Sequence, residues 1–317
     1  MLFVFALPTK HPQGLLHFLD CLFQFYISYL NQYLISYFII QTYLVEKRMS
    51  NVTPIKINLT DGRLPLKKKG LEMKEFANVA EIRRDQLEKL AAGFRFFAHC
   101  GFNEGVAGHI TYRDPEFPDH FWVNPLGVHF SQISVSDLIL VNHDGDVVQG
   151  DRDVNVAAFA IHSRLHKARP DVNAAAHSHS IQGRTFSTLG KLLDPISQDA
   201  CAFYEQQAIY SDFSGVVEEV EEGDAIAKAL GDKKVIILQN HGILTTGPSV
   251  DIALWFYTSM ERCCQAQLAA EAAGEPIIIP HDTAVKTREF IANDIAAWAS
   301  FQPAFDMIVK KERDLLD

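Results

Sequence analysis

The sequence predicts an α/β fold, in which helices are mixed with a sheet of short strands in a single domain. Two observations lead to this prediction. From about residue 79 onward, segments with helical spacing of apolar residues alternate with short apolar runs bounded by turn residues. The composition of the 317-residue chain, 48% hydrophobic and 21% charged, is that of a globular protein with enough apolar side chains for a sizeable core.

Each expected element has its own signal. The first helix should stop at Gly101, and the second should end before Pro170, which cannot continue a helix. Asp144-Gly145 predicts a turn between two strands. Helices are expected over 79–100, 157–168, 183–189, 218–230, 250–273 and 282–299. Strands are expected over 109–112, 121–123, 138–141, 146–148, 174–180 and 234–239.

The N-terminal part of the chain differs from the rest. Residues 1–48 are far more apolar than the residues after them, and residues 21–45 carry no charge over a length that could cross a bilayer as a helix. Polar residues interrupt that stretch, so three interpretations remain: a membrane anchor, a buried amphipathic helix, or an extension upstream of the natural start. We favour the extension, because the chain from Met49 onward reads as an ordinary globular protein. Residues 49–78 would form a polar arm, residues 79–280 the main domain, and residues 281–317 a C-terminal helical segment.

Charge and cysteine content exclude several classes of function. With 29 basic and 39 acidic residues the net charge is -10, and the chain has no block of basic residues suited to nucleic acid. The five cysteines lack CxxC spacing, so we expect free thiols in a reducing, cytoplasmic compartment. The glycine motifs of dinucleotide and P-loop sites are missing from the sequence, and no Ser-His-Asp arrangement supports acyl transfer.

Three histidines form the strongest candidate for a functional site. His177 and His179 lie two apart in a predicted strand, so both side chains should point to the same face. His241 ends a second apolar strand and is followed by Gly242, which lets the backbone turn or approach closely. Three neutral imidazoles with an open fourth position are typical of a catalytic Zn²⁺-type site. A histidine on an apolar strand is more often a packed core residue, so the residues alone leave both interpretations open.

Five short motifs, in this order along the chain, resemble those of the class II aldolase/adducin family. They occupy residues 101–108, 124–127, 168–171, 177–179 and 239–242, and the resemblance spans about residues 85–275. It implies a three-layer α/β/α domain around a central mixed or antiparallel sheet. It also implies that His177, His179 and His241 bind a divalent metal ion, with Zn²⁺ expected first and Mn²⁺ or Fe²⁺ also compatible. Enzymes of the family are often tetramers with sites between subunits, so a homo-oligomer is expected.

The sequence departs from the sugar-phosphate aldolases of that family in two respects. Their acid/base Glu falls on Ala158 when counted back from His162, and no acid lies between Asp153 and Asp171. The positions of their phosphate-binding loops are mostly aliphatic here, whereas a dianionic phosphate needs several hydrogen-bond donors. Those positions are Val106, His109, Leu126, Val156 and Ala157. The resemblance therefore implies an unphosphorylated substrate.

Several other residues are weaker candidates for the site. The candidates for catalysis are His162, Tyr204 and Glu205, and the candidates for substrate binding are His109, His129, Asn124 and Gly127. The resemblance places the helix of His162 beside the metal, where this side chain could orient substrate or act as a base. Glu205 could replace the missing base, Tyr204 could donate the final proton, and His109 or His129 could bind a substrate carboxylate. A packing, turn or surface role remains the alternative for these residues.

The leading hypothesis is a metal-dependent lyase that cleaves a carbon–carbon bond of a small unphosphorylated hydroxy or keto acid. The reaction would be a decarboxylation or a retro-aldol cleavage, with the bond electrons passing into an enolate that the metal stabilises. Decarboxylation fits better, because loss of CO₂ needs no base to deprotonate a leaving hydroxyl. The alternative is a non-enzymatic, adducin-like scaffold that binds the actin cytoskeleton, which the missing Glu favours.

Overall fold

The computed structural model describes residues 74–216 and 219–317, which fall within one compact unit. The predicted extension 1–48, its apolar stretch 21–45 and nearly all of the arm 49–78 lie outside the described residues. In the described part of the chain, no helix is both long and apolar enough to cross a bilayer.

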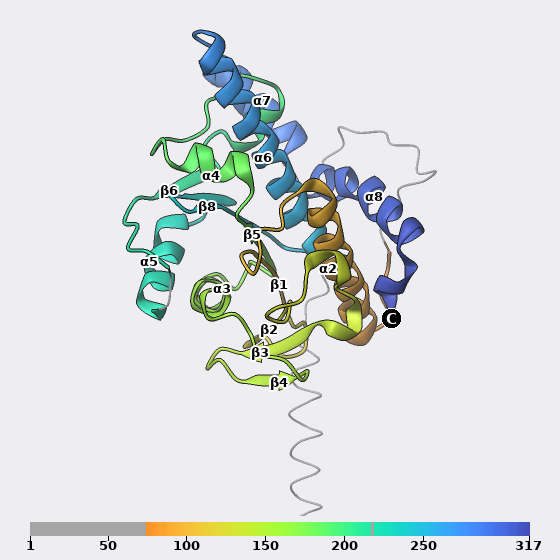
Figure 1. The fold of residues 1–317 in the computed structure, drawn as a ribbon. Coiled ribbons are helices and arrows are strands. Elements are labelled where there is room, and N and C mark those ends of the chain that lie inside the picture. The colour runs from red at the N-terminus through yellow and green to blue at the C-terminus, as the bar shows by residue number, and fades with distance from the viewer. Residues whose placement is uncertain (1–73, 217–218) are drawn as a thin grey trace, which may run out of the picture. The chain divides into compact units, whose positions relative to one another are not determined.

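A sheet of eight strands runs through the domain (Figure 1). The strands are β1 (His109–Arg113), β2 (His120–Val123), β3 (Ile139–Asn142), β4 (Val147–Gln149), β5 (Ala174–Ser178), β6 (Gln207–Tyr210), β7 (Val235–Leu238) and β8 (Gly242–Gly247). Their order across the sheet is β4-β3-β2-β1-β5-β8-β7-β6. Neighbours are antiparallel except β6 and β7, which are parallel, so the sheet is mixed, one of the two predicted forms.

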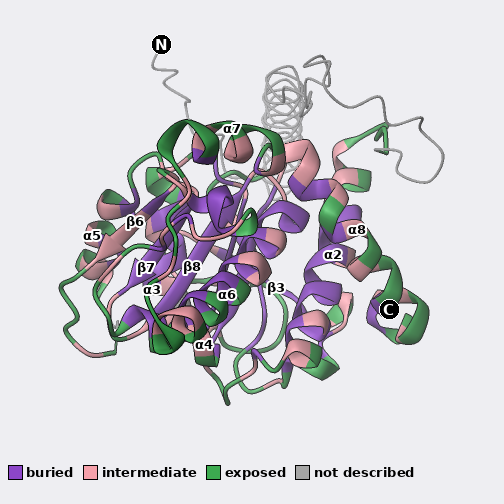
Figure 2. Ribbon diagram, turned by 90° about the horizontal axis from the view of Figure 1, so that it is seen from above, coloured by how far each residue is buried: buried purple, intermediate pink, exposed green. Residues whose placement is uncertain are grey.

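Helices cover both faces of this sheet. They are α2 (Val79–Cys100), α3 (Val156–Ala168), α4 (Ile181–Ser187), α5 (Val220–Leu230), α6 (Val250–Ala273), α7 (His281–Ile291) and α8 (Asp294–Lys311). On one face, α3 and α5 share an apolar cluster with Ala175 and Ile236 of the sheet. On the other, α2 and α6 share the main core with Ile110 and Ile237. Figure 2 shows buried strands between helices whose outer sides are exposed, and the three-layer α/β/α prediction is confirmed.

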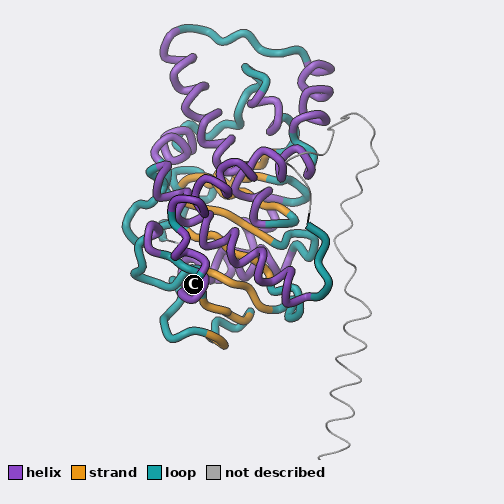
Figure 3. The backbone as a smooth tube through the Cα atoms, turned by 90° about the vertical axis from the view of Figure 1, so that its right-hand side faces the viewer, coloured by secondary structure: helices purple, strands orange, loops and turns teal. Residues whose placement is uncertain are grey.

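Several expected elements need correction, and among them the helix expected over 183–189 is α4, at Ile181–Ser187. Strands β6 and β8 were not predicted. In Figure 3 the strands of the sheet, in orange, lie stacked among the helices. The single helix expected over 282–299 is two helices, because Asn293 interrupts it and caps α8 by accepting a hydrogen bond from Ala296 N. Strand β5 stops at Ser178, short of the expected residue 180, because Ser180 is already the residue before α4.

Local sequence explains the limits of α2, which agree with the prediction. At its start the Asn78 side chain accepts a hydrogen bond from Glu81 N. At its end Gly101 has φ 74°, a left-handed conformation that glycine adopts without strain, and its N–H donates to Ala98 O. The chain then turns into the loop that leads to β1.

Histidines gather on the face of the sheet that α3 covers. In β1 the side chains alternate, so Ile110 packs into the main core while the His109 ring contacts His162 of α3. Strand β5 pairs with β1 and places His177 directly opposite His109. Both imidazoles therefore lie on the same face, near the ends of adjacent strands.

Candidate metal centre

Three histidine side chains meet just beyond the end of β5. His177, His179 and His241 each offer one nitrogen, and these nitrogens lie within 4.8 Å of one another. The His177 ring centroid is 5.3 Å from that of His179 and 4.8 Å from that of His241. The structure thus brings together the three histidines predicted as a metal site.

A tight hairpin positions His241. The sequence placed this residue at the end of a strand, but β7 stops at Leu238 and His241 lies in the turn before β8. Asn240 in that turn has φ 60°, a conformation that Asn tolerates better than most residues. A side chain at Gly242 would meet Ser178 O at 3.3 Å, so glycine permits the close approach of this hairpin to β5.

The hydrogen bonds and burial of these rings favour neutral imidazoles. His177 Nδ1 lies 2.9 Å from Ile243 O, a pure acceptor, so Nδ1 carries the hydrogen and Nε2 is left unprotonated. Burial lowers the pKa of His177 well below its usual value and that of His241 to about 4. Burial and, to a lesser extent, Arg184 lower the pKa of His179. His179 and His241 bring their Nε2 atoms within 3.0 Å, so converging neutral nitrogens fit a divalent metal ion.

A buried carboxylate supports the turn that carries His179. Glu261 of α6 accepts hydrogen bonds from Ser180 Oγ at 2.6 Å and from Gly183 N at 2.6 Å, at the start of α4. Tyr257, one helical turn away on α6, donates its hydroxyl to Ser178 O at 2.8 Å. Ser178 and Ser180, the two neighbours of His179 in the chain, are therefore both hydrogen-bonded to α6. Sequence reasoning missed this support, although Tyr257 and Glu261 are an i, i+4 pair of polar groups in an apolar helix.

Weakening this support should weaken metal binding. Glu261→Gln keeps one acceptor oxygen and loses the other. We therefore expect divalent-metal affinity to fall about tenfold, the smaller of the losses seen when a residue that supports a metal ligand is changed. Isothermal titration with Mn²⁺ measures the affinity. Glu271→Gln, on the same helix but in a partly exposed ion pair with Lys191, is the control and should leave it unchanged. An unchanged affinity in Glu261→Gln would show that the carboxylate does not position His179.

Two further histidines predicted for the site lie in the layer behind the three rings. His109 is 4% exposed, and its ring centroid is 6.4 Å from that of His177. His162 on α3 is fully buried, and its Nδ1 lies 2.8 Å from Thr111 Oγ1. Burial lowers the pKa of His162 to about 3, so this ring is neutral and holds no proton to donate as an imidazolium.

The other substrate-binding candidates lie in loops. His129 is exposed, and its ring nitrogens contact Asn103 at 2.7 Å and Ser131 at 2.7 Å. Asn124 is buried just after β2, and its Oδ1 has no hydrogen-bond partner among the described residues. Gly127 is exposed with φ 82°.

The structure connects Tyr204 and Glu205 to helix α7. The Tyr204 hydroxyl lies 3.0 Å from His281 Nδ1, and Glu205 pairs with Arg288 at 2.9 Å. Arg288 also donates to Tyr204 O at 2.8 Å. These contacts fix the two side chains against α7 and bring neither to the three histidines, so they give no support to an acid/base role within one chain.

Comparison with known proteins identifies the family. The model of the class II aldolase and adducin N-terminal domain matches residues 88–268. The chain belongs to this family. The predicted resemblance is thereby confirmed, and the matched residues contain all five of the motifs that carry it.

Relatives in the class II aldolase and adducin family include proteins with different names. Decarboxylase NovR of Streptomyces niveus is 42% identical over 242 residues, which cover 76% of this chain and 90% of that protein. Alpha-adducin of Rattus norvegicus is 36% identical over 193 residues, 59% of this chain but 26% of adducin. The solved L-fuculose 1-phosphate aldolase from Glaciozyma antarctica PI12 has a TM-score of 0.72 and 44% identity, covering 77% of this chain and 96% of that one. The predicted enzyme of the lyase type is supported by the decarboxylase among these relatives and by the family match.

The family's phosphate-loop positions present apolar side chains in this structure. Val106 is 60% exposed, Leu126 41% and Val156 61%. Asn155 Nδ2 donates to Val106 O at 3.3 Å, which ties the glycine loop to the start of α3. Exposed aliphatic groups cannot donate hydrogen bonds to a phosphate. The family's Glu position, Ala158, falls within α3, but its side chain lies outside the described residues.

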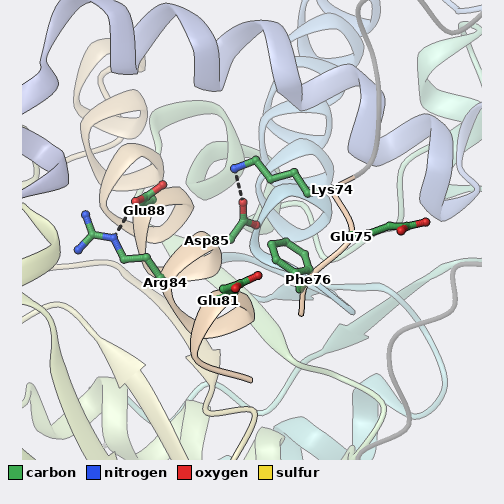
Figure 4. A pocket seen from close by; sticks show the side chains of 7 residues that line it. All are labelled: Lys74, Glu75, Phe76, Glu81, Arg84, Asp85 and Glu88. Carbon is green, nitrogen blue, oxygen red and sulfur yellow. Dashed lines mark hydrogen bonds and ion pairs between the residues drawn. The ribbon is translucent and has the colours of Figure 1, made fainter. Parts of the chain in front are cut away.

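A surface hollow at the start of α2 is separate from the histidines. Figure 4 shows its lining side chains, which include the ion pairs Lys74–Asp85 and Arg84–Glu88. Its lining carries four carboxylates and two basic groups, and it holds none of the predicted site residues.

Proposed function

We propose that the chain is a metal-dependent lyase that cleaves a carbon–carbon bond of a small unphosphorylated hydroxy or keto acid. The observation that carries the proposal is the convergence of the three neutral imidazoles of His177, His179 and His241. Three protein ligands leave coordination positions for two substrate oxygens, which is the arrangement of catalytic metal sites. The relative named as a decarboxylase supports the same class of reaction.

The residues of the chain would each perform a limited task. His177, His179 and His241 would hold the cation, while Glu261 and Tyr257 keep the turn around His179 in place. When bound, a divalent cation supplies Lewis-acid stabilisation of the negative charge that develops on the substrate. Zn²⁺ suits three imidazoles best, and Mn²⁺ and Fe²⁺ are compatible with them.

Decarboxylation is the form of the reaction that we favour. Retro-aldol cleavage requires a base for the leaving hydroxyl, and the family's Glu position is Ala158. Loss of CO₂ requires no such base, and only the final protonation of the product carbon needs a donor. His162 is buried and neutral, and the Tyr204 hydroxyl contacts His281, so we propose solvent as the source of this proton.

A screen for CO₂ release tests the proposal. Metal-free protein would be reconstituted with Zn²⁺, Mn²⁺ or Fe²⁺ and offered a panel of small hydroxy and keto acids. We expect release from at least one acid that depends on the metal and stops when a chelator is added. Absence of both CO₂ release and aldehyde formation across the panel would overturn the lyase proposal.

Phosphorylated ketoses should be poor ligands, despite the name of one solved relative. The aliphatic side chains of Val106, Leu126 and Val156 offer no donors to a phosphate dianion. L-fuculose 1-phosphate should therefore bind the metal-loaded protein no more tightly than L-fuculose, as measured by isothermal titration. Tighter binding of the phosphate would mean that donors outside these loops form a phosphate site.

The second candidate function is an adducin-like scaffold that binds actin. Ala158 at the family's Glu position and the similarity to alpha-adducin favour it. Against it, a scaffold does not need three converging imidazoles. Co-sedimentation with filamentous actin distinguishes the two, because the lyase proposal predicts no pelleting above a matched control protein.

Oligomeric state and compartment complete the proposal. We propose a homo-oligomer, the usual state of the enzymes in this family, which sedimentation analysis of the full chain would test. Cys100, Cys201, Cys263 and Cys264 are free in the described part of the chain, in keeping with a reducing compartment such as the cytoplasm.

A further inference from the structure

A buried chain of hydrogen bonds joins α3 to β1 behind the three histidines. Thr111 Oγ1 lies 2.8 Å from His162 Nδ1 and 2.9 Å from His166 Nε2. At the far end, His166 Nδ1 lies 3.3 Å from Val172 O. Thr111 and His162 are fully buried and His166 is 1% exposed, so water does not compete for these bonds.

The carbonyl at the far end sets the direction of every bond in the chain. Val172 O can only accept, so His166 Nδ1 carries a hydrogen. Burial keeps His166 neutral by lowering its pKa well below the usual value, so its Nε2 must accept the Thr111 hydroxyl hydrogen. That hydroxyl has one hydrogen, so Thr111 Oγ1 must accept from His162 Nδ1. His162, also neutral, is left with an unprotonated Nε2.

Two unpaired nitrogen atoms remain where this chain ends. His162 Nε2 and His109 Nδ1 are both buried without a hydrogen-bond partner among the described residues. The two rings meet edge to face, with centroids 5.9 Å apart and planes at 88°. An unpaired buried polar atom costs stability, so each of these two nitrogens calls for a partner or a functional reason. A lone pair on His162 and an N–H on His109 would satisfy each other after a small rotation of either ring.

His109 stands between this chain and the proposed metal centre. It lies opposite His177 on the neighbouring strand, with ring centroids 6.4 Å apart. It is not one of the three converging ligands, because only His177, His179 and His241 form that group among the described residues.

We propose that Thr111 and His166 are positioning residues that fix His162 as an acceptor for His109 Nδ1–H. This hydrogen bond leaves His109 Nε2 unprotonated beside the metal centre, where it accepts a hydrogen bond from a hydroxyl of the substrate. The first part concerns only the tautomers of the chain. The second part rests on the proposed function. The hydrogen bond to His109 Nε2 would favour substrate acids that carry a hydroxyl group over acids that carry none.

The tautomer of His162 can be measured in the unmodified protein. A long-range ¹H–¹⁵N correlation spectrum of the full chain labelled at histidine distinguishes a protonated ring nitrogen from an unprotonated one. The His162 signals would be assigned by their loss in His162→Gln. We expect a neutral ring with hydrogen on Nδ1 and none on Nε2. A neutral ring with hydrogen on Nε2 would overturn the inference, whatever reaction the protein catalyses.

Removing one hydroxyl tests the functional part. Thr111→Val is nearly isosteric but removes the two hydrogen bonds that the Thr111 hydroxyl makes to His162 and His166, whereas Thr111→Ser retains the hydroxyl. We expect Thr111→Val to lower kcat/KM for the hydroxy acid found in the screen by about tenfold, as for other groups one layer behind a metal site. Metal content should stay the same, the effect should be smaller for an acid without a hydroxyl, and Thr111→Ser should restore most of the loss.

Thr245→Val is the matched control for this variant. Thr245 is a fully buried threonine of the same sheet whose hydroxyl donates to Ala253 O at 2.8 Å, with no histidine in contact. The Thr245→Val variant should leave kcat/KM unchanged. Equal losses in Thr111→Val and Thr245→Val, or equal losses for acids with and without a hydroxyl, would overturn the role of the chain in positioning substrate. If Thr111→Val does not fold, the tautomer measurement still decides the first part.

Discussion

Replacing His241 with alanine should remove most divalent-metal binding while the domain remains folded. His241 supplies one of three nitrogens that lie within 4.8 Å of one another, and two imidazoles alone hold a cation far more weakly than three. The turn between β7 and β8 depends on Asn240 and Gly242 rather than on the His241 ring, so the hairpin should persist. Metal per chain, measured by elemental analysis after gel filtration, should fall from about one to near zero.

The control is an exposed histidine outside the site. His281→Ala removes a side chain on α7 that contacts Tyr204 but lies outside the group of converging nitrogens, so it should keep full metal content. Circular dichroism of both variants should match that of the unmodified protein, because a domain of this size is stable without a cation. Full metal occupancy in His241→Ala would contradict the three-ligand centre.

Acid should destabilise the metal-free domain steeply below pH 6.5. His162 has a pKa of about 3 in the folded protein, against about 6.5 in the unfolded chain. Between these values the unfolded chain binds more protons, so the free energy of unfolding decreases as the pH is lowered. By pH 5 this one residue should cost about 2 kcal/mol. Burial also lowers the pKa values of His109, His166 and His177, so their contributions have the same sign. No loss from these groups is expected above pH 6.5.

Urea denaturation at pH 7.5 and pH 5, with a chelator present, measures this difference in the free energy of unfolding. His162→Gln is informative even if it is less stable, because glutamine does not titrate. The difference between the two pH values should shrink by about 2 kcal/mol in this variant. A free energy of unfolding that is the same at both pH values would show that the histidines are not buried as neutral rings.

Sequence reasoning was most successful where structure depends on local signals. Helix α2 was predicted with its observed limits, because the helical spacing of its apolar residues and Gly101 at its end can be seen in the sequence itself. Strand β8 was missed, because Gly242–Gly247 contains two glycines and two threonines and has little apolar patterning. Its strand conformation comes from pairing with β5 and β7, which is a long-range effect.

The same distinction applies to the site. His177 and His179 could be predicted because two residues of one strand share a face. The support from Glu261 and Thr111 could not, because Glu261 reaches the turn from 81 residues away in the chain and Thr111 meets His162 from 51 residues away. Their partners depend on how α6 and α3 pack on the sheet. Tyr204 and Glu205 became candidates because they lie in a polar stretch after the HxH segment, but their partners on α7 could be seen only in the structure.

Titrating metal into metal-free protein while following CO₂ release tests the central claim most directly. The acid would be the one identified by the screen, and both the unmodified protein and His241→Ala would be measured. We predict a rate that rises with bound metal and saturates at one ion per chain in the unmodified protein, with almost no rate in His241→Ala. A full rate without metal, or the same rate in both proteins, would contradict a lyase that depends on a metal held by His177, His179 and His241.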